Sequence, residues 1–184
     1  MILKKFVYKN VNSTNDIAIK IIKNSNNKCG LVIADNQKKG RGRYGKKWIS
    51  FKGNIFVTFF FNIDKNNLSL KKMTYINCFL IKRLLSSYCN KRISIKAPND
   101  LLVNKKKISG ILQEIIKKNK KKYMIVGIGI NLIKNPNITN YPTTNLLEVS
   151  KRKVNKKEII LRLKKIYEKF IPKLDLYTTG KILW

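Results

Sequence analysis

The sequence predicts an α+β fold: a mixed, largely antiparallel sheet covered by helices on one side. Strand-like segments follow one another in runs, and only a few segments have helical spacing, a pattern typical of α+β domains. Apolar residues make up 43% of the 184 residues, which is enough for one buried core without disulfides or metals. We therefore expect a single domain over residues 1–184.

Six elements are expected in the first half of the chain. The first strand, expected at an edge of the sheet, mixes apolar residues with lysines. The helix after it begins at polar side chains that can cap it, and the second strand is continuously apolar. A loop follows that has three glycines and no aliphatic residue. The third strand consists mainly of β-branched and aromatic residues, and the long helix after it has apolar residues at helical spacing. In order, they are a strand at 2–8, a helix at 13–22, a strand at 30–34, a loop at 37–47, a strand at 54–62 and a helix at 68–88.

The second half is expected to add strands and one helix. A strand alternates apolar and polar residues, a basic turn joins two strands into a hairpin, and a second basic turn leads into another strand. An irregular segment with two prolines follows, and Asn155 can then cap a helix whose apolar residues share one face. In order, these are a strand at 92–96, strands at 101–103 and 108–116, a turn at 117–122, a strand at 123–130, an irregular segment at 135–147 and a helix from 155 to about 171.

The composition excludes several classes of protein. The chain has no histidine, which removes Ser-His-Asp and Cys-His catalysis and HExxH zinc sites. No stretch approaches the roughly 18–20 apolar residues of a membrane span, and the N-terminus lacks the apolar core of a signal peptide, so the expected location is the cytoplasm. Cys29, Cys78 and Cys89 form no C-x-x-C pair, and buried free thiols are favoured over a metal or redox site.

The net charge is +32, from 41 Lys and Arg against nine Asp and Glu. Such a charge attracts nucleic acid, anionic lipid, acidic proteins and phosphorylated substrates. Lysine is spread along the whole chain beside abundant Asn and Ile, so a compositional background is favoured over a dedicated nucleic-acid surface. The charge alone does not identify the function.

The loop that ends at Trp48 is the most informative segment. Glycines at 40 and 42 allow a backbone to approach a ligand closely, and Arg41 and Arg43 add permanent positive charge with a planar donor fork. Trp48 adds a flat apolar face suited to a base or ring. A basic loop that contacts RNA is the alternative, but its arginine-glycine motif occurs once and lies between two apolar strands, so a small-molecule anion site is favoured.

Two further blocks carry polar residues and glycines. Lys96-Ala97-Pro98-Asn99-Asp100 predicts a rigid corner, and it is followed by Lys107 and Gly110 on an apolar strand, where a glycine indicates close passage of a ligand. The second block alternates glycine with apolar residues at 126–130 and ends at Asn131. It is not a dinucleotide fingerprint, because the third glycine and the following helix are missing.

Four blocks in this order resemble the catalytic domain of biotin protein ligases, the biotin–[acetyl-CoA-carboxylase] ligases. They are Ser13-Thr14-Asn15, the Gly-Arg-Gly-Arg loop closing on Trp48, Lys96-x-Pro-Asn-Asp with Lys107-x-x-Gly-Ile-Leu, and Gly-Ile-Gly-Ile-Asn131. The resemblance covers roughly residues 6–132 with motifs. It implies the class II synthetase-like fold of biotin and lipoate ligases and an activity that attaches biotin to a carrier-protein lysine through biotinyl-5′-AMP.

The resemblance also implies a role for each matching position. Catalysis is expected from Arg41, Arg43 and Lys107, with ATP and biotin as substrates and Mg²⁺ as the metal, whose ligands the sequence leaves unknown. The residues expected to bind biotin are Ser13, Thr14, Asn15, Gln37, Arg41, Gly42, Arg43, Lys107 and Gly110. The residues expected to bind ATP are Gly40, Trp48, Lys96, Asn99, Asp100 and Asn131.

The sequence departs from the family pattern at Ala97, where relatives usually have Trp, and at Lys46, which replaces a common arginine. An N-terminal helix-turn-helix domain is not expected, and neither is most of a small C-terminal barrel. The implied partner is the biotin carboxyl carrier domain of a carboxylase, without specific DNA binding or membrane attachment, and a homodimer is left open. Two alternatives remain: a lipoate or octanoate ligase, and a basic nucleic-acid-binding protein without catalysis.

Overall fold

The computed structural model describes residues 1–64, 69–139, 141–150, 154–174 and 176 of the chain. The strands in this part are β1 (Lys5–Val11), β2 (Cys29–Gln37), β3 (Ile55–Asn62), β4 (Ile93–Lys96), β5 (Asp100–Val103), β6 (Lys106–Lys118) and β7 (Lys121–Ile130). The helices are α1 (Thr14–Asn24), α2 (Leu70–Ser86), α3 (Leu146–Val149) and α4 (Lys156–Phe170), with short 3-10 turns at Arg43–Gly45 and Ile171–Lys173.

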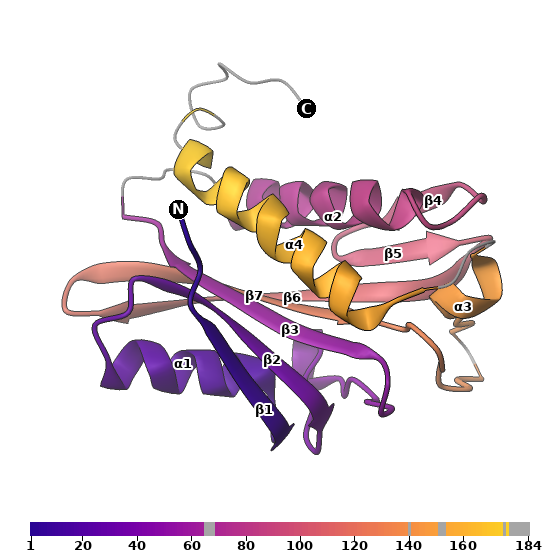
Figure 1. Ribbon diagram of the computed structural model, residues 1–184, viewed down its shortest axis with the longest axis horizontal. Helices are drawn as coiled ribbons and strands as arrows, with labels where there is room; N and C mark the ends of the chain where they lie inside the picture. Colours follow the sequence, from indigo (N-terminus) through magenta and orange to yellow (C-terminus); the bar gives the residue numbers. More distant parts are fainter. Residues whose placement is uncertain (65–68, 140, 151–153, 175, 177–184) are drawn as a thin grey trace.

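All of these strands belong to one sheet, which has seven strands in the described part of the chain. Their order is β1-β2-β3-β7-β6-β5-β4 (Figure 1). The β1–β2 pair is parallel, and every other neighbouring pair is antiparallel. The mixed, largely antiparallel sheet predicted from the sequence is confirmed.

Helices cover both faces of this sheet, so the prediction of helices on one side is wrong. Figure 1 shows α2 and α4 on one face and α1 on the other. On the first face, Phe59 of β3 packs in one core cluster with Ile76 of α2 and Leu163 of α4. On the second face, Phe60 of β3 packs in a smaller cluster with Ile22 of α1. Since alternate residues of a strand point to opposite faces, the continuous apolar sequence of β3 requires cover on both sides.

Several element boundaries differ from the sequence prediction. The first strand is β1 and starts later than residue 2, although it is an edge strand as predicted. The second basic turn is shorter than residues 117–122: only Asn119 and Lys120 have positive φ, and the lysines on either side belong to β6 and β7. The segment 135–147, predicted to be irregular, includes the start of α3. Leu68, the expected start of the long helix, lies outside the described residues.

The two predicted helix caps have different outcomes. Asn155 accepts hydrogen bonds from the amides of Lys157 and Glu158 at the start of α4, which confirms its role as a cap. Ser13 occupies the N-cap position of α1, but its side chain makes no capping hydrogen bond. The polar side chains in the first turn of α1 instead contact residues of other elements, as described below.

Cys78 and Cys89 are buried, Cys29 is half-buried, and all three are free thiols, which agrees with the sequence prediction apart from the partial exposure of Cys29. Burial raises the pKa of Cys78 to about 12, so this thiol stays protonated. No helix in the described ranges is long and apolar enough to cross a membrane.

Tyr167 attaches α4 to the sheet. Its ring is fully buried and stacks on Phe59 of β3, with ring centroids 3.8 Å apart and an angle of 8° between the planes. Its hydroxyl donates to Oδ1 of Asn77 in α2, which is also buried. Burial raises the pKa of Tyr167 well above its usual value, so the phenol remains a hydrogen-bond donor. One side chain thus links two helices and the central strand.

We predict that Tyr167→Phe lowers the free energy of unfolding by about 1–3 kcal/mol, because Asn77 Oδ1 then stays buried without its donor. Urea unfolding monitored by circular dichroism measures this change. Tyr167→Ala should cost about 3–5 kcal/mol, because a cavity is added to the lost hydrogen bond. Equal stability of the Phe variant and the unaltered chain would show that the hydroxyl contributes nothing.

Candidate active site

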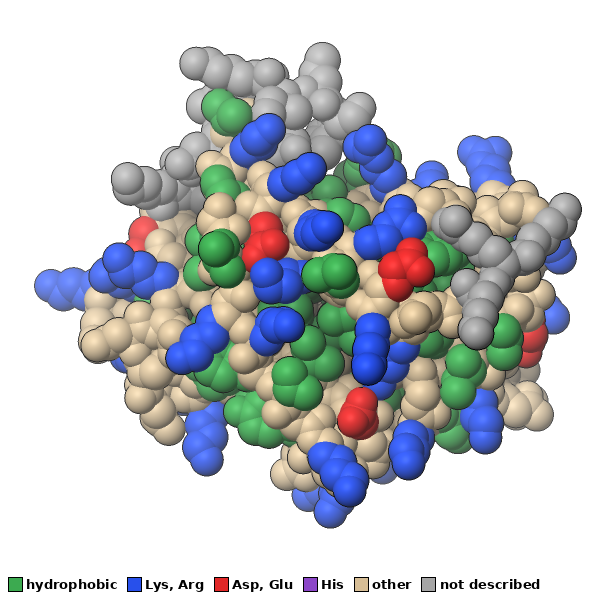
Figure 2. Space-filling model, viewed as in Figure 1, with side chains coloured by type: hydrophobic (Ala, Val, Ile, Leu, Met, Phe, Trp, Pro, Cys, Tyr) green, Lys and Arg blue, Asp and Glu red, His purple; other side chains and the backbone are tan. Residues whose placement is uncertain are grey.

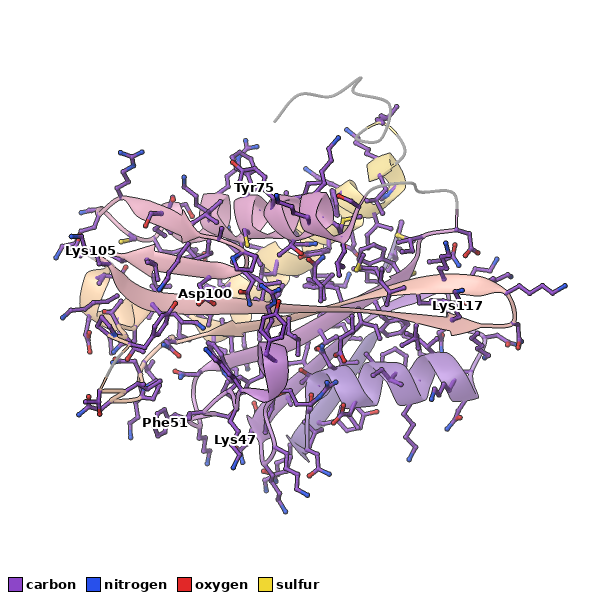
Figure 3. The ribbon with its side chains drawn as sticks, turned by 180° about the vertical axis from the view of Figure 1, so that it is seen from behind. Lys47, Phe51, Tyr75, Asp100, Lys105 and Lys117 are labelled. Atoms are coloured by element: carbon purple, nitrogen blue, oxygen red, sulfur yellow. The ribbon has the colours of Figure 1, made fainter. Side chains whose placement is uncertain are left out.

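A cavity of about 560 Å³ lies on the side of the sheet that carries α1. Figure 3 shows Asp100 on the sheet and Lys47 in the loop below it, on the side where α1 lies. The cavity brings together segments that are far apart in the sequence: the start of α1, the loop after β2, the corner before β5, strands β6 and β7, and the segment after β7. The predicted site residues that line it are Ser13, Thr14, Asn15, Gln37, Arg41, Gly42, Arg43, Trp48, Lys96, Asn99, Asp100, Lys107 and Gly110.

Gly40 and Asn131 are the predicted site residues that do not line the cavity. Gly40 lies at the base of the loop, where its carbonyl accepts from the amide of Trp48 at 2.9 Å. A Cβ at Gly40 would come within 2.5 Å of the Trp48 carbonyl oxygen, so the loop can close only with glycine at this position. Asn131 lies at the end of β7 and is 1% exposed.

Glycines form the floor of the cavity. Gly110 of β6 pairs with Gly129 of β7 in the sheet, and the indole of Trp48 lies against both. A Cβ at Gly110 would come within 2.9 Å of Trp48 Cζ3, and one at Gly129 would collide with the same ring system. The bare backbone at these two positions lets the loop residue lie directly on the sheet.

Two buried polar atoms beside this floor have no hydrogen-bond partner within the described residues: Nε1 of Trp48, a donor, and Oδ1 of Asn131, an acceptor. The amide of Asn131 does donate, to the carbonyls of Thr144 at 3.1 Å and Lys107 at 3.4 Å. Buried polar atoms in native proteins are normally paired, and one that is not calls for a ligand, water or ion. A bound molecule with both an acceptor and a donor can satisfy these two atoms.

Lys107 is held by one carboxylate between two aromatic rings. Its Nζ lies 2.8 Å from Oδ1 of Asp100, 5.4 Å from the centroid of the Trp48 ring and 5.3 Å from that of Tyr141. The other oxygen of Asp100 accepts from the Tyr141 hydroxyl at 2.5 Å. Burial, together with this hydrogen bond, raises the pKa of Tyr141 well above its usual value, so its phenol stays protonated. Lys96 Nζ lies 4.4 Å from the Tyr141 ring centroid, which places a second cation beside the cluster.

Arg41 is bound by two carboxylates. Its Nη1 and Nη2 donate to the two oxygens of Glu114 at 2.9 and 2.8 Å, and Nη2 also lies 2.8 Å from Oδ1 of Asp16. Hydrogen bonding to Glu114 raises the pKa of Arg41 further above its usual value. The guanidinium fork that the sequence assigned to anionic ligands is therefore bound by protein carboxylates.

The far end of the cavity is a network of uncharged polar groups. Oε1 of Gln37 accepts from the amide and the hydroxyl of Thr14, at 2.9 and 3.1 Å. The hydroxyl of Thr58 on β3 lies 2.8 Å from that of Thr14 and 2.7 Å from Oδ1 of Asn15. Since Thr58 is fully buried, these contacts anchor the first turn of α1 to the centre of the sheet. Amides and hydroxyls held in this way suit a polar, uncharged ligand group.

The loop between Gly40 and Trp48 folds as a small hairpin. The amide of Gly42 donates to the carbonyl of Lys46 at 2.6 Å, so it is used inside the loop. Tyr44, at the tip, has φ 53°, and its ring and hydroxyl contact the guanidinium of Arg43. On the opposite side of the cavity, the Asn99 side chain donates to the Ile111 carbonyl at 2.8 Å, which fixes the corner between β4 and β5.

Sequence reasoning missed four residues of this arrangement: Asp16, Thr58, Glu114 and Tyr141. The sequence pattern could have indicated Glu114, because this residue is four positions after Gly110 on a predicted strand and so lies on the same face. The pattern could also have indicated Thr58, because it is a polar residue inside an apolar strand. Tyr141 lies in an irregular segment, where no periodicity shows which way a side chain points.

The charges of the site differ from those of the face that Figure 2 shows. On the face that Figure 2 shows, Lys and Arg are spread widely and acidic residues are few. At the cavity, by contrast, both Arg41 and Lys107 contact acids. The chain has nine Asp and Glu, and Asp16, Asp100 and Glu114 are the three that make these contacts. The site is thus a set of paired charges within a basic protein.

Comparison with known proteins gives consistent similarities. A protein-family model described as "Biotin/lipoate A/B protein ligase family" matches residues 7–131. The bifunctional ligase/repressor BirA of Bacillus subtilis is 29% identical over 186 aligned positions, which cover 95% of this chain and 56% of that protein. A biotin–[acetyl-CoA-carboxylase] ligase of Paracoccus denitrificans is 32% identical over 65% of this chain and 51% of its own length. The chain thus spans about half the length of these curated relatives.

Among solved structures, a biotin protein ligase from Aquifex aeolicus in complex with biotin and ATP is similar, with a TM-score of 0.78 and 28% identity. The similarity covers 94% of this chain and 72% of that one. The predicted fold class, that of the catalytic domain of such ligases, is confirmed.

We predict that Gly129→Ala displaces Trp48 from the floor, because the added methyl group would occupy the space of the indole ring. Fluorescence of Trp48, measured with Trp184 replaced by Phe, should change in intensity and wavelength as the ring becomes more exposed. Val126→Ala is the matched control: Val126 packs in the core on the opposite face of β7, so this variant should lose stability but leave the emission of Trp48 unchanged. Unaltered emission in Gly129→Ala would contradict the described position of the ring.

Proposed function

The chain belongs to the biotin/lipoate A/B protein ligase family, and on that premise we propose that it is an ATP-dependent biotin ligase. It would join biotin to a lysine of a carrier protein through biotinyl-5′-AMP. Relatives named as biotin ligases, and the solved structure of one with biotin and ATP, support this proposal. The described residues form one sheet with helices on both faces, which supports a single catalytic domain over residues 1–184.

One observation carries the proposal. The blocks that resemble biotin ligases lie on separate elements, and they meet around a single cavity of about 560 Å³. This volume is within the range of roughly 300–1,000 Å³ that is typical of small-molecule sites. The cavity has an uncharged polar end around Thr14 and Gln37, and it has cations at Lys107 and Lys96. Biotin has the matching form, with a neutral polar ring system at one end and a carboxylate at the other.

We assign the predicted residues to three parts of this cavity. The carboxylate of biotin and the α-phosphate would meet at Arg41, Gly42, Arg43 and Lys107, of which Arg41, Arg43 and Lys107 would also serve catalysis. The rings of biotin would be bound by Ser13, Thr14, Asn15, Gln37 and Gly110. The nucleotide would be bound by Gly40, Trp48, Lys96, Asn99, Asp100 and Asn131.

The unpaired atoms of Trp48 and Asn131 support a nucleotide beside the glycine floor, next to the Trp48 ring. Adenine has ring nitrogens that can accept from Trp48 Nε1 and an amino group that can donate to Asn131 Oδ1. Either atom would otherwise remain a buried polar group without a partner.

In the first step a biotin carboxylate oxygen attacks the α-phosphorus of ATP, and the bond to pyrophosphate breaks. The carboxylate is already a nucleophile, so the absence of histidine is no obstacle. The reaction requires instead that two anions lie side by side, which cations in fixed positions make possible. Lys107 is fixed between Trp48 and Tyr141 by Asp100, so its charge is in place before the substrates bind.

Mg²⁺ fits as an ion that enters with ATP. The described residues contain no cluster of three or more His, Cys, Asp or Glu that could hold a metal on their own. Mg²⁺ at nucleotide sites is usually held by phosphates, water and one or two carboxylates, and Asp100 would supply the carboxylate. When bound, the ion would neutralise charge on the phosphates.

In the second step the lysine amine of the acceptor attacks the acyl carbon, AMP leaves, and an amide forms. The amine must be neutral to react. Lys96, Arg43 and Lys107 line the cavity, and nearby positive charges disfavour a further ammonium ion. The same cations that hold the anions would therefore lower the pKa of the incoming lysine, without a dedicated base.

We propose the biotin carboxyl carrier domain of a carboxylase as the acceptor and the cytoplasm as the location. The charge of +32 would speed encounter with an acidic acceptor, and salt would weaken this effect.

A lipoate or octanoate ligase is the nearest alternative, because the matching family includes lipoate ligases. Incubation of the protein with α-labelled ATP and each acid separately decides between them. We predict labelled biotinyl-AMP with biotin and no adenylate with lipoate or octanoate. A lipoyl or octanoyl adenylate would favour the alternative. No adenylate with any acid, together with steeply salt-dependent nucleic-acid binding, would favour a non-catalytic binding protein.

We predict that Lys107→Met slows formation of biotinyl-AMP by roughly 10²–10³-fold, as removal of one charge-stabilising group does in other enzymes. Rapid-quench measurement of the adenylate at saturating ATP isolates this step. Lys117→Met is the matched control, since Lys117 lies exposed at the far end of the same strand, β6, and should leave the rate unchanged (Figure 3). Equal rates for the two variants would remove Lys107 from the proposed mechanism.

A further inference from the structure

Glu114 is a carboxylate close to a cavity that, by the proposed function, has to bind two anions. It lies on β6 with its side chain 25% exposed, four residues after Gly110 of the floor. A free carboxylate there would repel both substrates. The contacts of Glu114 explain how a carboxylate can lie beside a site for two anions.

Both oxygens of Glu114 are occupied. Oε1 accepts from Arg41 Nη1 at 2.9 Å, and Oε2 accepts from Arg41 Nη2 at 2.8 Å and from Asn15 Nδ2 at 2.6 Å. A parallel pair of charge-assisted hydrogen bonds is the strongest and most directional arrangement between these two side chains. Glu114 thus presents its charge to Arg41 and not to the open cavity.

Asn15 holds Glu114 from the other side. Its Oδ1 lies 2.7 Å from the hydroxyl of Thr58, which is fully buried on β3. Its Nδ2 also lies 3.4 Å from the carbonyl oxygen of Leu112 on β6. Glu114 is therefore fixed by a chain of contacts that begins in the centre of the sheet.

Arg41, in turn, belongs to a loop that is otherwise bonded mainly to itself. Backbone hydrogen bonds join Gly42 to Lys46 and Trp48 to Gly40, and a β-bridge joins Arg41 to Lys47. The side chain of Arg41 reaches out of this hairpin to Glu114 on β6 and to Asp16 on α1. These ion pairs tie the loop hairpin to the sheet and to the first helix.

We propose that Glu114 is a positioning residue that acts through Arg41 and holds the loop of residues 40–47 over the cavity. Since the loop would shield biotinyl-AMP from water, its attachment determines how long the intermediate is retained. In this arrangement Glu114 fixes the guanidinium of Arg41, which anchors the loop and adds positive charge to that of Lys107 and Arg43 at the cavity. The effect of Glu114 on biotinyl-AMP rests on the proposed function, whereas its effect on the position of the loop does not.

Glu114→Gln is the direct test, because glutamine keeps an acceptor for Asn15 and loses the charge and the paired hydrogen bonds to Arg41. In the ligand-free protein, an arginine-specific protease should cut at Arg43 about tenfold faster in this variant, as expected for loss of a partly exposed paired contact. Asp35→Asn is the matched control: it removes one carboxylate from an exposed ion pair, with Lys156, and should leave the cutting rate unchanged.

A double-mutant cycle shows whether Glu114 acts through Arg41. Glu114→Gln should also release biotinyl-AMP about tenfold faster, and it should have no further effect on either readout once Arg41 is replaced by Met. A general loss of structure would give additive effects and a lower unfolding midpoint. Additive effects, or a cutting rate at Arg43 that does not change, would overturn the proposal.

Asp16→Asn gives a second route to the same answer if Glu114→Gln fails to fold. Asp16 makes the other ion pair to Arg41 with its side chain 48% exposed, so this variant should change both readouts in the same direction by a smaller factor. Unchanged readouts in this variant would contradict the anchoring role of Arg41. If the unaltered protein forms no biotinyl-AMP, the proposed function fails, and the protease measurement still decides the role of Glu114.

Discussion

The site depends on the absence of side chains at two paired positions of the central sheet. Gly110 and Gly129 face each other across β6 and β7, and their bare backbones allow the Trp48 ring to lie on the sheet. On the opposite face of the same strands, Ile111 and Ile128 are packed in the main core. The floor of the cavity is therefore as rigid as the core behind it, and a site built on such elements holds its geometry better than one built on loops alone.

Charge pairing is the second constraint. Arg41 and Lys107 would repel each other and the surrounding lysines if they stood alone in a protein of +32. Glu114 and Asp16 hold one of them, and Asp100 holds the other. The cations are therefore fixed in position before any ligand arrives, which reduces the reorganisation needed when anions bind. The same pairing lowers the net positive charge of the cavity, so its selectivity for anions comes from geometry as well as from charge.

Much of this arrangement follows from the sequence, and specific physical features explain the rest. In residues 126–130, glycine alternates with apolar residues, which places Gly127 and Gly129 on the same face of β7. This is the face that borders the cavity. Lys107 and Gly110 are three residues apart and would point to opposite faces of a regular strand. The register of β5 with β6 shifts so that Leu101 pairs with Ser109 and Leu102 with Lys107, and this bulge brings the lysine to the glycine floor. No sequence pattern predicts such a bulge.

The expectation of helices on one face failed for a related reason. That expectation rested on the runs of strand-like segments and the few helical ones, whereas β3 is buried along almost its whole length, a pattern that requires cover on both faces. That second layer is α1, and its first turn carries Thr14 and Asn15 to the polar end of the cavity. The error in the fold thus concerns the element that positions the polar end of the cavity.

In a chain with 41 basic residues, a lysine near a cavity carries little information, because cations are expected everywhere on the surface. An acid carries more. Six of the nine acids form ion pairs within the described residues: Asp16, Asp100 and Glu114 contact the site cations Arg41 and Lys107, and the other three pair with Lys156, Arg162 and Lys164 away from the cavity. What distinguishes the site cations is therefore an acid partner together with a place at the cavity. The sequence identified Arg41 by its glycine-flanked loop and assigned a role to Lys107 by resemblance to a family, and the structure adds the carboxylates that contact both residues. In this protein, acid partners become informative about the site only when combined with the lining of the cavity.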